Sequence, residues 1–163
     1  MRPQRIEPGP GQESVWDYPR PPRIDPSSDR IVVRLAERVI ADTTASLRVL
    51  ETSQPPAFYI PASDIDLDLL VPATGRSFCE WKGEASYHDV VVGSNRVDQG
   101  AWSYADPSPG FVLLQDHFAF YAQRLECSVD GEDVTANEGT FYGGWITSKV
   151  VGPFKGGVGS TWW

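Results

Sequence analysis

The sequence has few cysteines and no cysteine pattern typical of a metal site. Its 163 residues include two cysteines, Cys79 and Cys127, which are far apart and belong to no Cys-x-x-Cys pair. The sequence therefore indicates neither a disulfide framework nor a structural zinc. We expect two buried thiols in a reducing compartment, with no bound metal and no cofactor.

Long apolar segments and clusters of basic residues are also missing. No apolar segment follows Met1, and no aliphatic run is longer than the three residues Val90 to Val92. The sequence therefore predicts neither a signal peptide nor a membrane span. The net charge is −8, and no Lys/Arg cluster offsets it. Because an acidic surface repels phosphate groups, we expect no nucleic-acid partner and no binding to anionic membranes. The predicted location is cytoplasmic.

Glycine, proline and aromatic residues are abundant instead. The 15 glycines and 14 prolines, against a single methionine, favour turns and short strands over long helices. The length suits one domain with a hydrophobic core. We predict a mainly β protein: a Pro-rich N-terminal arm over residues 1–30, a single small domain of short antiparallel strands over 31–134, and a C-terminal extension rich in glycine and aromatic residues over 135–163.

The N-terminal arm contains seven prolines, which prevent it from forming a helix or a central strand. It also contains Trp16 and Tyr18, which a fully solvated arm would not need. Two interpretations remain open. These aromatic side chains either dock on the domain and close a pocket, or simply pack the extension against it.

One short helix is expected at residues 63–70. The alternating Asp and apolar residues there also fit a strand, but Ser63 is a good N-cap, and Asp64 and Asp66 would lie in the first turn, where the helix dipole favours carboxylates. Pro72 would end the helix. On a strand these carboxylates would share a face and could hold Mg²⁺, whereas a helix start separates them.

The densest group of chemically interesting residues lies in a predicted hairpin, with one strand over 76–84 and the next over 87–92. Alternation along the first strand places Cys79 and Trp81 on one face and Lys82 on the other. Held over aromatic walls, Lys82 could bind a phosphate or a carboxylate. The alternative is a surface lysine paired with its glutamate neighbours.

Four aromatic residues of this region are candidates for a ligand pocket. Trp81 and Tyr87 belong to the hairpin, and Trp102 and Tyr104 lie in a further aromatic strand. Ligand pockets are lined mostly by aromatic and apolar side chains with a few polar groups. The same four residues would serve equally well as the core of a small β domain.

Five motifs follow one another along the chain: Glu13–Pro22, Cys79–Gly83, Ala101–Tyr104, Gly143–Ser148 and Gly152–Gly156. Together they resemble the microbial family known as domain of unknown function 427, which is also filed under a nucleotidyltransferase-like heading. The resemblance implies a small β domain similar to the Mss4-like β-tent. Relatives with that fold commonly hold zinc on two Cys-x-x-Cys motifs. This sequence has neither motif, so no metal is carried over.

The nucleotidyltransferase heading lacks its expected motif. The best-known enzymes of that kind use a Gly-Ser pair followed by two alternating carboxylates, which hold Mg²⁺ against the triphosphate. Here Gly93-Ser94 is followed by no such pair, and Asp64-x-Asp66 precedes it.

Three functions remain as hypotheses. In the first, the chain binds a small molecule through seven ligand-binding residues: Glu51, Cys79, Trp81, Lys82, Tyr87, Trp102 and Tyr104. In the second, Lys82 binds a nucleotide phosphate and Mg²⁺ is held by Glu51 or by Asp64 and Asp66. In the third, the aromatic arms form an interface with a partner or make the chain a homo-oligomer.

Overall fold

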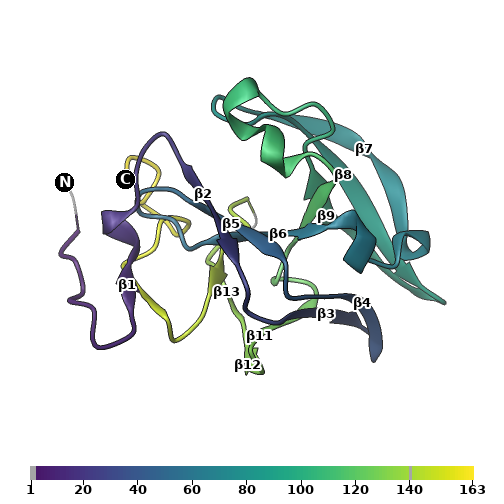
Figure 1. The fold of residues 1–163 in the computed structure, drawn as a ribbon, viewed down its shortest axis with the longest axis horizontal. Coiled ribbons are helices and arrows are strands. Elements are labelled where there is room, and N and C mark those ends of the chain that lie inside the picture. The colour runs from purple at the N-terminus through teal and green to yellow at the C-terminus, as the bar shows by residue number, and fades with distance from the viewer. Residues whose placement is uncertain (1–2, 140) are drawn as a thin grey trace.

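The computed structural model describes residues 3–139 and 141–163 and is mainly β, as predicted (Figure 1). Its largest part is a seven-stranded antiparallel sheet. In spatial order the strands are β2 (Arg23–Ser27), β5 (Ser46–Leu50), β6 (Ala57–Pro61), β10 (His117–Phe120), β9 (Asn95–Ser103), β8 (Gly83–Val92) and β7 (Leu70–Cys79). Pro26 lies in edge strand β2, where a missing amide donor removes no hydrogen bond from a central ladder.

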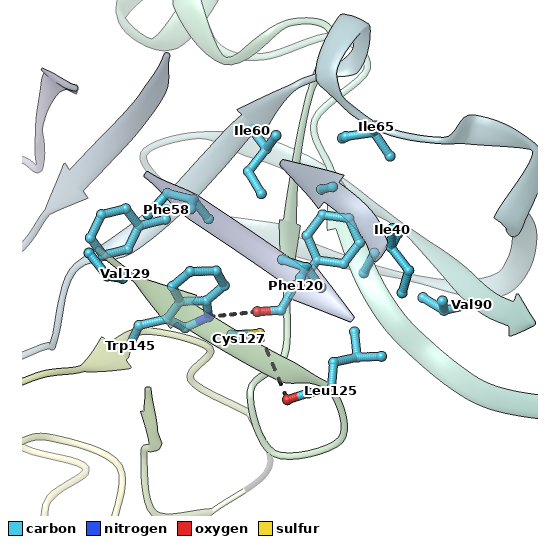
Figure 2. Packing of buried hydrophobic residues seen from close by; sticks show 14 residues of the cluster. Ile40, Phe58, Ile60, Ile65, Val90, Phe120, Leu125, Cys127, Val129 and Trp145 are labelled. Atoms are coloured by element: carbon cyan, nitrogen blue, oxygen red, sulfur yellow. Dashed lines mark hydrogen bonds between the residues drawn. The ribbon is translucent and has the colours of Figure 1, made fainter. Parts of the chain in front are cut away.

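A second, four-stranded sheet contains a hairpin over residues 31–43. Its order is β12 (Glu132–Asp133), β11 (Glu126–Val129), β3 (Ile31–Leu35) and β4 (Arg38–Thr43). Along β3, Ile31 and Val33 are fully buried. They pack into the main hydrophobic core together with Phe58 and Ile60 of the larger sheet (Figure 2).

Alternation along the larger sheet creates a second apolar face. In β6, Phe58 and Ile60 belong to the main core, whereas Tyr59 between them belongs to another cluster. In β9, Ala101 lies in the main core and Trp102 in the cluster of Tyr59. Neighbouring residues of a strand point to opposite faces, so the sheet presents a row of aromatic side chains on the face away from the main core.

The two extensions are paired with each other and built into the domain. β1 (Glu13–Ser14) runs parallel to β15 (Val150–Val151), and β1 lies at the opposite side of the molecule from β7 and β8 (Figure 1). Trp16 of the 3-10 turn η1 (Val15–Asp17) donates through Nε1 to the Pro153 carbonyl at 2.9 Å. It packs in an apolar cluster with Tyr18.

The C-terminal extension also reaches the main core. A two-stranded ladder joins β13 (Thr135–Ala136) to β14 (Trp145–Ile146). The Trp145 side chain is 1% exposed, stacks on Phe58 with ring centroids 5.2 Å apart, and donates through Nε1 to the Phe120 carbonyl at 2.8 Å (Figure 2).

The helical segment expected over 63–70 is present as two single 3-10 turns, η2 (Ala62–Asp64) and η3 (Leu67–Leu69). Ile65 between them is extended, is buried and forms a β-bridge with Ala41. This tertiary pairing interrupts the helix. A further 3-10 segment, η4 (Pro109–Leu114), is the coiled segment at the top of Figure 1. No helix in the described ranges combines the length and the apolar character needed to cross a membrane.

The turn of the central hairpin lies earlier than predicted. β7 ends at Cys79 and β8 begins at Gly83, which are cross-strand partners, so Glu80 to Lys82 form the turn. Gly83 has φ +106°, a left-handed conformation that favours glycine. The Ser108 amide donates to the Lys82 carbonyl at 2.9 Å. The alternation that separated Lys82 from Cys79 therefore does not hold, because Lys82 belongs to no strand.

Candidate functional site

A cavity of about 280 Å³ lies over the second apolar face of the large sheet. All seven residues that the sequence singled out line it: Glu51, Cys79, Trp81, Lys82, Tyr87, Trp102 and Tyr104. The structure thus brings them together from three separate stretches of the chain. Their contact with a ligand stays a prediction.

The aromatic wall is organised around Trp102. Its Nε1 donates to the Tyr59 hydroxyl at 3.1 Å, and the two rings meet edge to face, with centroids 6.1 Å apart. The centroid of the Tyr121 ring lies 4.5 Å from that of the Trp102 ring, and the centroid of the Tyr104 ring lies 6.2 Å from that of Tyr59. Such contacts fix the ring orientations, so this wall is preorganised.

The C-terminal extension supplies a side of the cavity that sequence reasoning missed. Phe141, Tyr142, Gly143, Gly144 and Lys155 all line it. Gly143 packs directly on Trp102, and a β carbon there would come within 2.3 Å of the indole ring. At Gly144 it would come within 2.2 Å of the Pro55 carbonyl oxygen. A glycine pair within an aromatic-rich extension was the sequence signal for this close approach.

Lys82 reaches the cavity from the hairpin turn. Its Nζ lies 5.6 Å from the centroid of the Tyr104 ring, a cation–π distance. Burial disfavours the charged form and acts to lower the pKa of Lys82. Tyr59, Cys79 and Glu51 act in the opposite direction and outweigh it, so the pKa stays above its ordinary value of 10.5. At neutral pH Lys82 is an ammonium ion.

The polar groups around Lys82 have defined partners or stay neutral. Glu51 is half-buried and pairs with Arg20, whose Nε lies 3.5 Å from Glu51 Oε2. The hydroxyls of Tyr87 and Ser77 are 2.7 Å apart. Burial, together with the Tyr59 phenol, raises the pKa of Tyr104, so its hydroxyl remains protonated.

Comparison with known protein families finds a match to this chain. A protein-family model described as "Domain of unknown function (DUF427)" matches residues 23–132, more than half of the chain. The chain belongs to this family. No match is found among curated proteins. The DUF427 region includes all seven predicted cavity residues, whereas Phe141 to Gly144 and Lys155 lie beyond it.

The basic side chains of this DUF427 protein are mostly neutralised by carboxylates. Among the residues that the structure describes, only four Lys or Arg side chains form no ion pair: Arg34, Lys82, Arg124 and Lys155. Lys82 and Lys155 line the cavity, and the Lys155 Nζ lies 5.3 Å from the centroid of the Tyr142 ring. Two of these four unpaired positive charges thus lie at the aromatic cavity.

A second hollow of about 160 Å³ adjoins the first. The two share Tyr87, Tyr121 and Phe141 as lining residues, and Arg124 lines the second.

Two of the three carboxylates named for the nucleotidyltransferase alternative, Asp64 and Asp66, lie elsewhere. Asp64 accepts a hydrogen bond from the Thr43 hydroxyl at 2.7 Å, and Asp66 accepts one from Arg38 at 2.7 Å. Neither lines the cavity that contains Lys82. Within residues 3–139 and 141–163, no group of three or more Asp, Glu, His or Cys residues has a metal-binding arrangement.

Proposed function

We propose that this DUF427 protein binds a small anionic molecule with a planar or apolar body. Lys82 pairs with the anionic group, and the rings of Trp102 and Tyr121 contact the body. The observation that carries the proposal is the charge of Lys82, which faces an aromatic cavity without a carboxylate partner among the described residues.

Electrostatic energy favours an anion at this position. A charge removed from water is costly unless it is paired. Lys82 has the Tyr104 ring on one side, while the nearby Glu51 carboxylate is paired with Arg20. A carboxylate or phosphate in the cavity would add a charge-assisted hydrogen bond to the ammonium, which neutral ligands cannot do.

The size and lining of the cavity restrict the body of the ligand. At about 280 Å³, the cavity is near the lower end of the usual range for ligand pockets, about 300–1,000 Å³. Its walls are aromatic on three sides, from the sheet, the β7–β8 hairpin and the C-terminal extension. A molecule with one or two rings in this cavity and an acid group at Lys82 fits this description.

The other two functions have less support. The transferase alternative needs carboxylates near Lys82, and of its candidates only Glu51 lines the cavity. The interface alternative relies on aromatic residues in the arms, but Trp16 and Tyr18 of the N-terminal arm are buried within the chain itself.

The test is a set of matched acids and amides. Phenylacetate and indoleacetate are compared with phenylacetamide and indoleacetamide, which differ from the acids chiefly in charge. Thermal shift and calorimetric titration are measured on wild type, on Lys82→Met and on Arg34→Gln, which removes an unpaired cation outside the cavity. We expect the acids to bind at least about tenfold more tightly than the amides, the worth of one charge-assisted hydrogen bond.

We further expect Lys82→Met to abolish that preference and Arg34→Gln to preserve it. A ligand held at about one hundred times its Kd adds roughly 2.7 kcal/mol of stability, which a thermal shift detects readily. Equal binding of acids and amides to wild type would contradict the proposal, as would an absence of binding. Stabilisation by nucleoside triphosphates only with Mg²⁺, lost in Lys82→Met, would favour the transferase instead.

A further inference from the structure

The second hollow extends the cavity towards a further cation. Its lining includes Tyr87, Tyr121 and Phe141, which also line the first cavity. Its remaining lining residues are Gln99, Gln123 and Arg124. A ligand that fills the first cavity and passes these shared residues would meet Arg124.

One tight turn holds the aromatic wall and this cation in a fixed relation. The Tyr121 carbonyl accepts hydrogen bonds from the Arg124 and Leu125 amides, at 3.3 and 3.2 Å. The turn is anchored by the Tyr121 ring on Trp102 and by the buried Leu125 side chain. Arg124 is therefore an exposed residue on a well-supported turn rather than on a loose loop.

The guanidinium of Arg124 has donors to spare. Its Nη1 donates to the Asp98 carbonyl at 2.5 Å, the one hydrogen bond of this side chain within the described ranges. The side-chain carboxylate of the same Asp98 pairs with Arg96 at 3.1 Å. A guanidinium has five N–H donors in a flat fork that suits a carboxylate or a phosphate.

We propose that the ligand is an elongated dianion whose aromatic body lies along Trp102 and Tyr121, with one acid group at Lys82 and the other at Arg124. This inference rests on the proposed function, because it assigns the second end of a ligand whose first end binds Lys82. It defines the ligand class as a two-ended acid rather than a simple aromatic monoacid.

The test uses a rigid probe, a biphenyl with a carboxylate at each end, and its mono-amide, which has the same shape and one charge fewer. Terephthalate serves as a shorter diacid. Titration calorimetry is carried out on wild type, Lys82→Met, Arg124→Gln and Arg124→Lys, with Arg34→Gln as the matched loss of an unpaired charge elsewhere. The melting temperature of each unliganded variant establishes that it is folded.

We expect the biphenyl diacid to bind wild type at least about tenfold more tightly than its mono-amide and more tightly than terephthalate. Arg124→Gln should remove this advantage while leaving the mono-amide affinity unchanged, and Arg124→Lys should restore part of it. Lys82→Met should weaken the binding of both biphenyl probes, whereas Arg34→Gln should weaken the binding of neither.

Three results would overturn the inference, and they differ in what they say about the proposed function. In the first, the mono-amide binds through Lys82 while the second acid group adds no affinity, and in the second, Arg124→Gln lowers the affinity of both probes equally. Either result would contradict the proposed dianion but would leave the proposed anion site at Lys82 in place. If no carboxylate binds wild type, including phenylacetate, both are wrong.

Discussion

Gly143 packs against the indole of Trp102 so closely that a β carbon at this position would lie 2.3 Å from Cη2 and 2.7 Å from Cζ3. Real β carbons do not approach ring atoms that closely, so Gly143→Ala must move either the extension or the indole. We expect the substitution to cost about 1–3 kcal/mol of unfolding free energy, as overpacking does, and to weaken ligand binding, because Trp102 forms the cavity wall. Urea denaturation and calorimetric titration measure the two effects.

Gly110→Ala is the matched control. A β carbon at Gly110 would meet no atom within 4 Å, and Gly110 has no positive φ. Gly110→Ala should leave both the unfolding free energy and ligand binding close to their wild-type values. If Gly143→Ala behaves like this control, the extension is not a wall of the cavity in solution.

The grouping of the cavity residues from the hairpin and the Trp102 strand was predictable, but the residues on the far side of the cavity were not. The density of aromatic residues around Lys82 and in the Trp102 strand pointed to residues that line one cavity. Strand alternation, however, placed Lys82 on the face opposite Cys79 and Trp81, because it assumed a regular strand through the turn. Tyr121, Phe141 and Lys155 come from later segments, and nothing local to them indicates which face of the sheet they cover.

The position of the hairpin turn was also not predictable from the local sequence pattern. The sequence pattern ended the first strand at residue 84 and began the second at residue 87, whereas β7 ends at Cys79 and β8 begins at Gly83. The structure fixes the turn through the positive φ of Gly83 and the contact between Ser108 and the Lys82 carbonyl, a contact from another part of the chain. Ile65 likewise divides the expected helix through its bridge to Ala41. The likeness to the Mss4-like β-tent stays a prediction.

The C-terminal extension should contribute directly to stability through Trp145. Trp145→Phe removes the donor to the Phe120 carbonyl, which is buried, and leaves a space beside Phe58. We expect a loss of about 2–4 kcal/mol, combining an unsatisfied carbonyl with a smaller side chain. Denaturant unfolding measures it.

Trp162→Phe provides the comparison for Trp145→Phe, because Trp162 is 92% exposed. This surface change should alter stability by no more than about 0.5 kcal/mol. Equal effects of the two substitutions would show that Trp145 is not part of the core.

Stability should fall as the pH decreases through the histidine range, because of His88. Its Nε2 lies 3.0 Å from the Ser103 hydroxyl, and its ring packs on Phe118. Burial, with the positive charge of Arg76, lowers the pKa of His88 below its ordinary value of 6.5. The unfolded chain therefore binds a proton more readily than the folded protein, so protonation below pH 6.5 favours unfolding.

The measurement is urea denaturation at a series of pH values between neutral and the range where carboxylates titrate. His88→Gln, which can keep a hydrogen bond to Ser103, should flatten the decline, whereas His117→Gln should not. A decline that survives in His88→Gln would assign it to another group.

The two cysteines should differ in reactivity. Cys127 is 6% exposed, and burial raises the pKa of its thiol to about 12, so it should resist iodoacetamide until the protein unfolds. Cys79 is half-buried and lines the cavity, so it should react in the folded protein. Mass spectrometry of labelled peptides distinguishes the two sites.

A ligand in the cavity should protect Cys79. Phenylacetate at about ten times its Kd leaves roughly one-eleventh of the sites empty, so alkylation should slow about tenfold. Phenylacetamide at the same concentration should protect less. Unchanged alkylation with saturating phenylacetate would place the bound acid away from Cys79.

Anion binding should be independent of pH across the neutral range. Because the pKa of Lys82 is raised above 10.5, the ammonium is charged at every pH below that value. A carboxylic acid ligand is ionised above its own pKa of about 4.3, so the Kd of phenylacetate should be constant between about pH 6 and 9 and should rise only on acidification. Calorimetric titration in buffers of matched ionic strength measures this profile, with Lys82→Arg as a variant that cannot lose its charge. If the affinity of wild type falls between pH 7 and 9 while that of Lys82→Arg does not, Lys82 is neutralised in the free protein, and its burial outweighs the polar groups around it.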